Sequence, residues 1–175
     1  ELMPHQILSG LYGRLHHGLV QLDSKEIGVS FPEYDEHKPS LGSHLRLHGS
    51  ETALRELMAT DWLQGMQDYL RLDTIATTPT GTKHRVVSRV QANSNVERLR
   101  RRAMSRHGIS QTEATQRLPD SATERLHLPF VILGSRSTRQ SRFPLFIRQG
   151  ALLEQPVAGT FSSYGLSQRA TVPWF

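Results

Sequence analysis

Hydrophobic residues in the first part of the chain recur at the spacings of two helices. Between residues 4 and 20 they return every third or fourth position, and Pro4 suits a first helical turn, so the pattern predicts an amphipathic helix. Its apolar stripe consists of Ile7, Leu8, Leu11, Leu15 and Leu19. Ser50 can cap a second helix, which we expect to run from Glu51 to about Gln67.

Short apolar runs predict strands beside these helices. They lie at 27–32, 44–48 and roughly 69–77, and the turn-rich segment TTPTGT follows the last of them. The order helix, strand, strand, helix, strand corresponds to a ferredoxin-like βαββαβ unit without its first strand. We expect that strand, which would precede Glu1, to be truncated, disordered or supplied separately. The predicted ferredoxin-like domain covers residues 1–81.

The second part of the chain, residues 82–175, is expected to combine short antiparallel strands with polar helices. Alternation of side chains predicts a strand at 84–91. Two apolar runs predict strands at 128–133 and 143–148, joined by a polar loop that contains three arginines. The fold class is therefore predicted to be α+β.

One helix of this second part is predicted to have an arginine face. Ser94 and Glu97 stand at capping-box spacing, and Gly108 can supply the left-handed residue that ends a helix begun at Asn95. Ser110 can then open a further short helix. The arginines of the face are Arg98, Arg101, Arg102 and Arg106. The opposite, apolar side consists of Val96, Leu99 and Ala103.

Charge is distributed unevenly along the chain. The formal net charge is +5, but residues 1–81 carry 6 basic and 11 acidic side chains, whereas residues 82–175 carry 15 and 5. Arginine accounts for 18 of the basic residues and lysine for 3, a ratio that favours two-pronged contacts to phosphate and base edges. We therefore expect a polyanion ligand, nucleic acid in particular. The alternative is a solvated surface without a partner, although such surfaces usually mix both signs.

Arg89 and Gln91 alternate onto one face of the strand predicted at 84–91. Arginine can pair with guanine and glutamine with adenine, each through two hydrogen bonds, so these residues are candidate readers of bases. The alternative is an edge strand with a polar outer face.

Composition argues against several other classes of protein. No apolar run approaches the roughly 20 residues that span a bilayer, and the N-terminus lacks a signal pattern, so we expect a soluble cytoplasmic protein without a membrane partner. The chain has no cysteine, which excludes disulfides, thiol nucleophiles and cysteine zinc sites. We expect no metal and no cofactor. The GxSxG motif of serine hydrolases does not occur.

Cleavage of RNA is a reaction that the remaining side chains could support. An RNA strand contains its own nucleophile in the 2′-hydroxyl, so a protein need only supply a base, hold the ribose and align the phosphate. Nine histidines are available as that base, although a lone histidine is more often structural. His16, at the flank of the first helix's apolar stripe, is one candidate.

Six segments of the chain resemble those of a known family. They read IGVSFP, SRVQANSNVERLRRRAMSRH, LPFVILGSRST, PLFIRQG, SSYGLS and VPWF, and the similarity runs in order from about Ile7 to Phe175. On these segments the chain resembles the CRISPR-associated endoribonucleases that process precursor crRNA in type I-F (Ypest subtype) systems.

The resemblance implies catalytic roles for three residues. The family's catalytic histidine lies in a motif like LYGRLHH, which corresponds to His16. Ser135 matches the serine that grips the ribose, with Ser137 as its neighbour in the S-x-S-T loop. Tyr164, in the motif YGLS, matches the tyrosine that orients the site.

The resemblance also implies how RNA is bound. Arg89 and Gln91 match two base-reading residues, and Phe143 matches an aromatic residue that stacks on the terminal base pair. The matches to arginines that enter the RNA groove are Arg101, Arg102 and Arg106.

The function implied by the resemblance is cleavage of a CRISPR repeat stem-loop, once and without metal, at the base of the stem's 3′ side. The 2′-hydroxyl attack would leave a cyclic phosphate and a free 5′-hydroxyl. The family stays on the mature crRNA with the other subunits of the type I-F surveillance complex. Two alternatives remain: a carrier that binds the hairpin without cutting it, and a double-stranded DNA regulator. A regulator would be expected to dimerise, and no dimerisation segment is evident.

Overall fold

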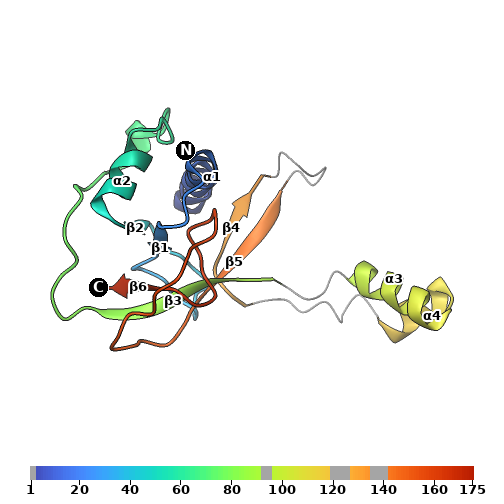
Figure 1. The fold of residues 1–175 in the computed structure, drawn as a ribbon. Helices are drawn as coiled ribbons and strands as arrows, with labels where there is room; N and C mark the ends of the chain where they lie inside the picture. The colour runs from blue at the N-terminus through green and yellow to red at the C-terminus, as the bar shows by residue number, and fades with distance from the viewer. Residues whose placement is uncertain (1–2, 92–95, 119–126, 135–141) are drawn as a thin grey trace. The chain divides into compact units, whose positions relative to one another are not determined.

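The chain folds into two compact units. The computed structural model describes residues 3–91, 96–118, 127–134 and 142–175 (Figure 1). The first unit combines Glu1–Val90 with Leu128–Phe175, and the second is Gln91–His127. These units are defined by packing, whereas the domains expected at 1–81 and 82–175 were defined by role, so that functional division stays a prediction.

In its described residues the first unit contains three helical segments and two antiparallel sheets. Its helices are α1 (Pro4–Leu22), α2 (Glu51–Met58) and the 3-10 helix η1 (Gln67–Tyr69). Its strands are β1 (Gly28–Ser30), β2 (Arg46–His48), β3 (Lys83–Val90), β4 (Phe130–Leu133), β5 (Phe143–Gln149) and β6 (Thr171–Trp174). One sheet pairs β1 with β2, and the other has the order β4-β5-β3-β6. The predicted α+β class is confirmed, and the ferredoxin-like arrangement stays a prediction.

Two expectations for the acidic part of the chain are wrong. The strand predicted at roughly 69–77 does not form: Leu72 and Ile75 are 62% and 40% exposed, and no described strand lies beside this segment to complete its ladder. The helix predicted to reach Gln67 ends at Met58, where the Thr60 hydroxyl donates to the Leu57 carbonyl and replaces a helical donor.

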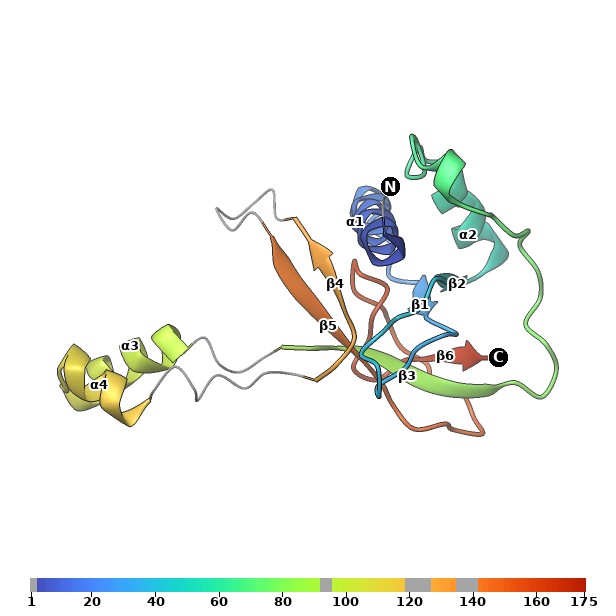
Figure 2. The ribbon, with the colours of Figure 1, turned by 180° about the vertical axis from the view of Figure 1, so that it is seen from behind.

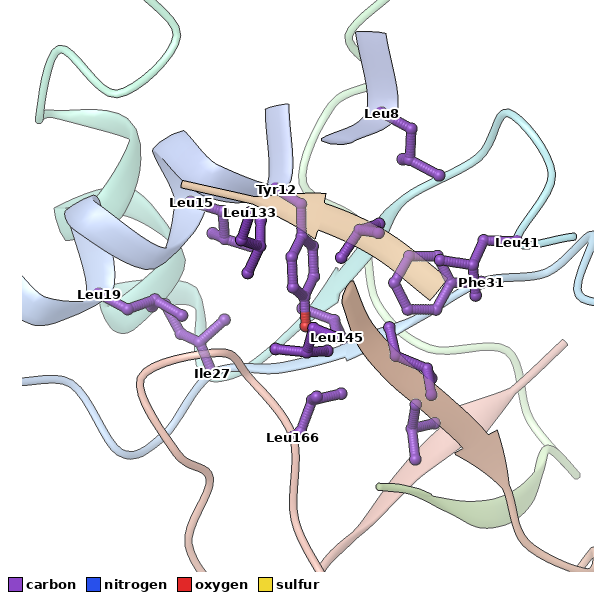
Figure 3. Close-up of a cluster of buried hydrophobic side chains, with 14 of the residues drawn as sticks. Leu8, Tyr12, Leu15, Leu19, Ile27, Phe31, Leu41, Leu133, Leu145 and Leu166 are labelled. Carbon is purple, nitrogen blue, oxygen red and sulfur yellow. The ribbon is translucent and has the colours of Figure 1, made fainter. Parts of the chain in front are cut away.

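Helix α1 forms as the apolar spacing predicts and lies above β1 and β2 together with α2 (Figure 1 and Figure 2). It begins at Pro4, and Asp23 ends it in a left-handed conformation with φ +48°. Its inward face carries Tyr12 beside the expected Leu8, Leu15 and Leu19 (Figure 3), and Leu11 is partly buried. Burial of a large apolar side chain contributes about 1.5–3 kcal/mol, so this face fixes the helix on the sheets.

The inward face of the larger sheet completes the same core. Side chains alternate along each strand, and Val87, Leu145 and Ile147 are buried on one side. Strand β3 pairs with β6 through its first half and with β5 through its second. The alternative reading of residues 84–91 as an edge strand is therefore wrong.

The described residues of the second unit form two helices, α3 (Val96–His107) and α4 (Gln111–Arg117). As predicted, Gly108 is left-handed with φ +61°, and its N–H donates to the Met104 carbonyl. The Ser110 hydroxyl accepts from the Glu113 N–H and opens α4. Arg100 donates from two nitrogens to the Leu118 carbonyl, at 2.9 and 2.6 Å, which ties the helices together. Ser94, the other half of the expected capping box, lies outside the described residues.

The small sheet partly buries a histidine. Ser30 Oγ lies 2.7 Å from His48 Nε2, and Ser30 is fully buried. Burial, with the positive charge of Arg46 as a smaller cause, lowers the pKa of His48 from 6.5 to about 4. His48 is therefore neutral in the folded protein at neutral pH.

The lowered pKa of the partly buried His48 predicts a loss of stability on acidification, because the unfolded chain takes up a proton that folded His48 does not. The loss begins as pH falls below 6.5 and reaches about 2 kcal/mol near pH 5. His48→Gln should remove this share of the pH dependence, whereas His37→Gln, at an exposed position, should keep it. Urea unfolding at about pH 7.5 and about pH 5 measures the difference. The same pH dependence in wild type and His48→Gln would contradict the prediction.

Candidate active site

A tight turn near the C-terminus forms the base of the site. The Ser162 carbonyl accepts from the Gly165 N–H at 2.8 Å, and the Ser162 N–H donates to the Leu166 carbonyl at 2.8 Å. Gly165 is left-handed with φ +69°, and its carbonyl accepts from the Val29 N–H at 3.0 Å. A Cβ at Gly165 would lie 2.7 Å from Val29 Cγ1, so glycine is required by both conformation and space. The turn is thereby held against β1.

His16 is attached to this turn by one hydrogen bond. Its Nδ1 lies 2.9 Å from the Ser163 carbonyl oxygen. Because a carbonyl oxygen can only accept, Nδ1 must carry the proton. In the neutral imidazole the other nitrogen, Nε2, then has a free lone pair and can act as a base.

The ring of Tyr164 fixes the plane of this imidazole. The His16 and Tyr164 ring centroids are 4.0 Å apart, and the planes differ by 9°, so the rings are stacked. The same turn therefore sets both the protonation and the orientation of His16.

The guanidinium group of Arg89, near the end of β3, lies beside the Tyr164 ring and brings a positive charge to the site. The guanidinium carbon of Arg89 lies 5.8 Å from the ring centroids of both Tyr164 and Phe143. The Arg89 carbonyl accepts from Gln168 Nε2 at 2.9 Å, which holds the end of the strand to the C-terminal segment. A base, a guanidinium group and two aromatic rings are thus gathered in one place, an arrangement that can receive a nucleotide.

The structure brings together some of the predicted site residues. His16, Tyr164, Arg89 and Phe143, which are far apart in sequence, lie in one cluster. Gln91 is exposed just beyond β3 and belongs to the second unit. Ser135 and Ser137 lie outside the described residues.

The arginine face of α3 forms as predicted. Leu99 and Ala103 are partly buried, and the exposed arginines of the described side chains are Arg101, Arg102 and Arg106. Arg98 is part of the helix, but its side chain lies outside the described part of the chain. Such a row of cations can contact successive phosphates.

The sequence analysis missed Tyr12 and the carbonyl groups of the turn. Tyr12 donates its hydroxyl proton to the Tyr164 carbonyl at 2.6 Å. The sequence does indicate that Tyr12 lies near His16, because it stands four residues earlier and must share the same helix face. The expected stripe, however, included aliphatic residues alone.

Two further observations concern the described residues. They contain no group of three or more histidine, aspartate or glutamate side chains placed to hold a metal ion. None of the described helices has the length and apolar character needed to cross a membrane.

Comparison with known proteins identifies the family. The sequence profile of the family described as CRISPR-associated protein (Cas_Csy4) matches residues 1–175, and the chain belongs to this family. It is 50% identical over 175 residues to the CRISPR-associated endonuclease Cas6/Csy4 of Pseudomonas aeruginosa (strain UCBPP-PA14), covering 100% of this chain and 93% of that protein. The protein of the same name from Escherichia coli (strain UTI89 / UPEC) is 42% identical, with the same coverage.

The packing of Gly165 predicts a large effect of a single methyl group. Gly165→Ala must adopt a left-handed conformation and also displace Val29, which together cost about 2–4 kcal/mol. Gly81→Ala is the matched control, because Gly81 also has positive φ but has no atom near a new Cβ. It should lose only about 1 kcal/mol. Urea unfolding of both variants checks this, and equal losses would contradict the role given to Val29.

Proposed function

We propose that this protein is a metal-independent endoribonuclease that binds the stem-loop of a CRISPR repeat and cleaves precursor crRNA at the base of the stem. The observation that carries the proposal is the state of His16, whose Nδ1–H is held by a carbonyl so that Nε2 is free to take a proton. Family membership and the endonuclease names of two relatives support the same activity.

In the proposed mechanism the RNA supplies the nucleophile. His16 Nε2 removes the proton of the 2′-hydroxyl beside the cut, and the resulting oxygen attacks the adjacent phosphorus. The bond from phosphorus to the 5′ oxygen breaks, and that oxygen gains a proton. The products are a 2′,3′-cyclic phosphate and a 5′-hydroxyl. Because the 2′-hydroxyl and the phosphate belong to one strand, the protein needs to align these two groups and does not need a metal to activate the nucleophile.

The other site residues are proposed to position the RNA. Tyr164 orients the imidazole by stacking, and Phe143 offers a ring to the last base pair of the stem. Ser135 is assigned to the ribose and Ser137 to the neighbouring backbone by their motif. Arg89 and Gln91 are assigned to reading the bases near the cut.

Affinity is proposed to come from the arginine helix. The major groove of A-form RNA is normally too deep and narrow for side chains, so a helix enters only near the open end of a short stem. A repeat hairpin meets this condition. Contacts from Arg98, Arg101, Arg102 and Arg106 to phosphates would hold the stem, and the stem keeps these contacts after cleavage.

Retention of the product follows from these contacts. The cleaved stem is expected to leave slowly, so the protein remains on the mature crRNA as a subunit of the type I-F surveillance complex in the cytoplasm. The acidic residues of 1–81, net −5, are then available for protein neighbours rather than for RNA.

The mechanism predicts cleavage of a repeat hairpin in EDTA. A substrate with a 2′-deoxy sugar at the cut should bind equally well but remain intact, because it lacks the nucleophile. His16→Ala should lower single-turnover cleavage by about 100-fold or more without weakening binding. His5→Ala, at an exposed position of α1, is the matched control. Gel electrophoresis of labelled RNA measures all four reactions.

Three outcomes would contradict the proposal in different ways. A requirement for added magnesium would exclude the metal-independent mechanism. Binding of both hairpins without cleavage would indicate a carrier, and a preference for duplex DNA would indicate a regulator.

The arginine helix predicts a salt-dependent affinity. Arg102→Ala should remove about one unit from the slope of log affinity against log salt concentration, because one phosphate contact is lost. Arg71→Ala is the control, since Arg71 is 95% exposed in the acidic part of the chain and lies 3.9 Å from Asp73. Filter binding of a repeat hairpin at several salt concentrations measures the slope. An unchanged slope for Arg102→Ala would exclude that contact.

A further inference from the structure

Tyr12 and His16 bind two successive carbonyl groups of one turn. They stand four residues apart on α1 and therefore on the same face of the helix. The Tyr12 hydroxyl donates to the Tyr164 carbonyl at 2.6 Å, and His16 Nδ1 donates to the Ser163 carbonyl at 2.9 Å. The helix thus holds the turn at two neighbouring points.

Tyr12 is built into the core so that its hydroxyl has one position. The side chain is fully buried, points from α1 into the buried cluster, and packs against Phe31 with ring centroids 5.9 Å apart (Figure 3). Burial raises the pKa of the Tyr12 hydroxyl, and the nearby Tyr164 adds to this effect. The hydroxyl therefore stays protonated, and it remains a donor throughout the pH range in which the protein works.

The Tyr164 carbonyl is flanked by groups on which the site depends. On one side is the Ser163 carbonyl, which holds the His16 proton, and on the other is Gly165, whose carbonyl accepts from Val29. The Tyr164 ring itself stacks on the imidazole. If the Tyr164 carbonyl lost its donor, it would be a partly buried acceptor without a partner, and rotation of the turn toward water would relieve this cost. Such a rotation moves the Ser163 carbonyl and the Tyr164 ring together.

From this geometry we infer that Tyr12 is a positioning residue of the active site, which keeps His16 in the Nδ1–H form by fixing the turn that carries Ser163 and Tyr164. The inference rests on the proposed function of His16 as the base. Tyr12 thus joins the residues on which the active site depends, although it touches neither RNA nor the reacting atoms. An imidazole without such a constraint favours the Nε2–H form, which has no lone pair at Nε2 and cannot act as the base there.

Tyr12→Phe tests the inference, because it removes the hydroxyl and keeps the ring in the core. In a long-range proton–nitrogen NMR spectrum, neutral His16 of the wild type should be in the Nδ1–H form, and in Tyr12→Phe a second, Nε2–H population should appear. Single-turnover cleavage of a repeat hairpin should fall by at least about tenfold, since misplacement of the base is costly, while hairpin affinity stays unchanged.

Tyr34→Phe is the matched control. Its hydroxyl also donates to a main-chain carbonyl, that of Ile147 at 3.2 Å, and to Glu36, and neither acceptor belongs to the turn. This variant should keep the wild-type NMR signature and the wild-type cleavage rate, even if both variants lose thermal stability.

Three results would overturn the inference: His16 of the wild type in the Nε2–H form, a Tyr12→Phe protein with the wild-type signature and rate, or an equal loss of cleavage in Tyr34→Phe. The first needs no variant and is decisive even if Tyr12→Phe does not fold. Failure of the wild type to cleave the hairpin would instead refute the proposed function, and the NMR comparison would still report on Tyr12.

Discussion

The hydrogen bond between His16 Nδ1 and the Ser163 carbonyl is the interaction on which the site depends. It joins residues 147 positions apart, so it forms only after the core has placed α1 against the C-terminal segment. Leu15 and Leu19 anchor the helix by packing in the core. The Val29 N–H holds the turn in place by donating to the Gly165 carbonyl. The packing of the hydrophobic core thus determines which nitrogen of the His16 imidazole carries the proton and which keeps a free lone pair.

The two units differ in the physical interactions that they offer to a ligand. In the first, buried contacts hold a few groups rigidly, which suits the proton transfer proposed for His16. In the second, exposed arginines on α3 are suited to long-range attraction of phosphate, which needs charge more than fixed geometry. Arg89 stands where β3 ends and the second unit begins. Placing Arg89 next to both Tyr164 and Phe143 gives the site a positive charge without a neighbouring carboxylate among its described contacts.

Features set by neighbours in sequence could be predicted, and features set by distant partners could not. The start of α1 at Pro4, the Gly108 terminus of α3 and the Ser110 cap of α4 follow from local signals, and the structure confirms them; α1 runs two residues beyond its predicted end, to Leu22. The strand expected at roughly 69–77 has the composition of a strand but no described partner, and a sequence cannot show whether a ladder will be completed. The helix face of Tyr12 could have been predicted from its spacing to His16, but its hydrogen bond could not, because the acceptor lies 152 residues away.

His16, Arg89 and Gln91 were candidates from residue chemistry and strand alternation, and resemblance added Ser135, Tyr164 and Phe143. The structure gives the arrangement of His16, Tyr164, Arg89 and Phe143. The central claim is that His16 lets the RNA attack itself. The most direct measurement is the mass of the two fragments made from a repeat hairpin of defined sequence. Attack by the 2′-hydroxyl predicts an upstream fragment ending in a 2′,3′-cyclic phosphate and a downstream fragment beginning with a 5′-hydroxyl. An upstream 3′-hydroxyl with a downstream 5′-phosphate would mean that water was the nucleophile and would contradict the account.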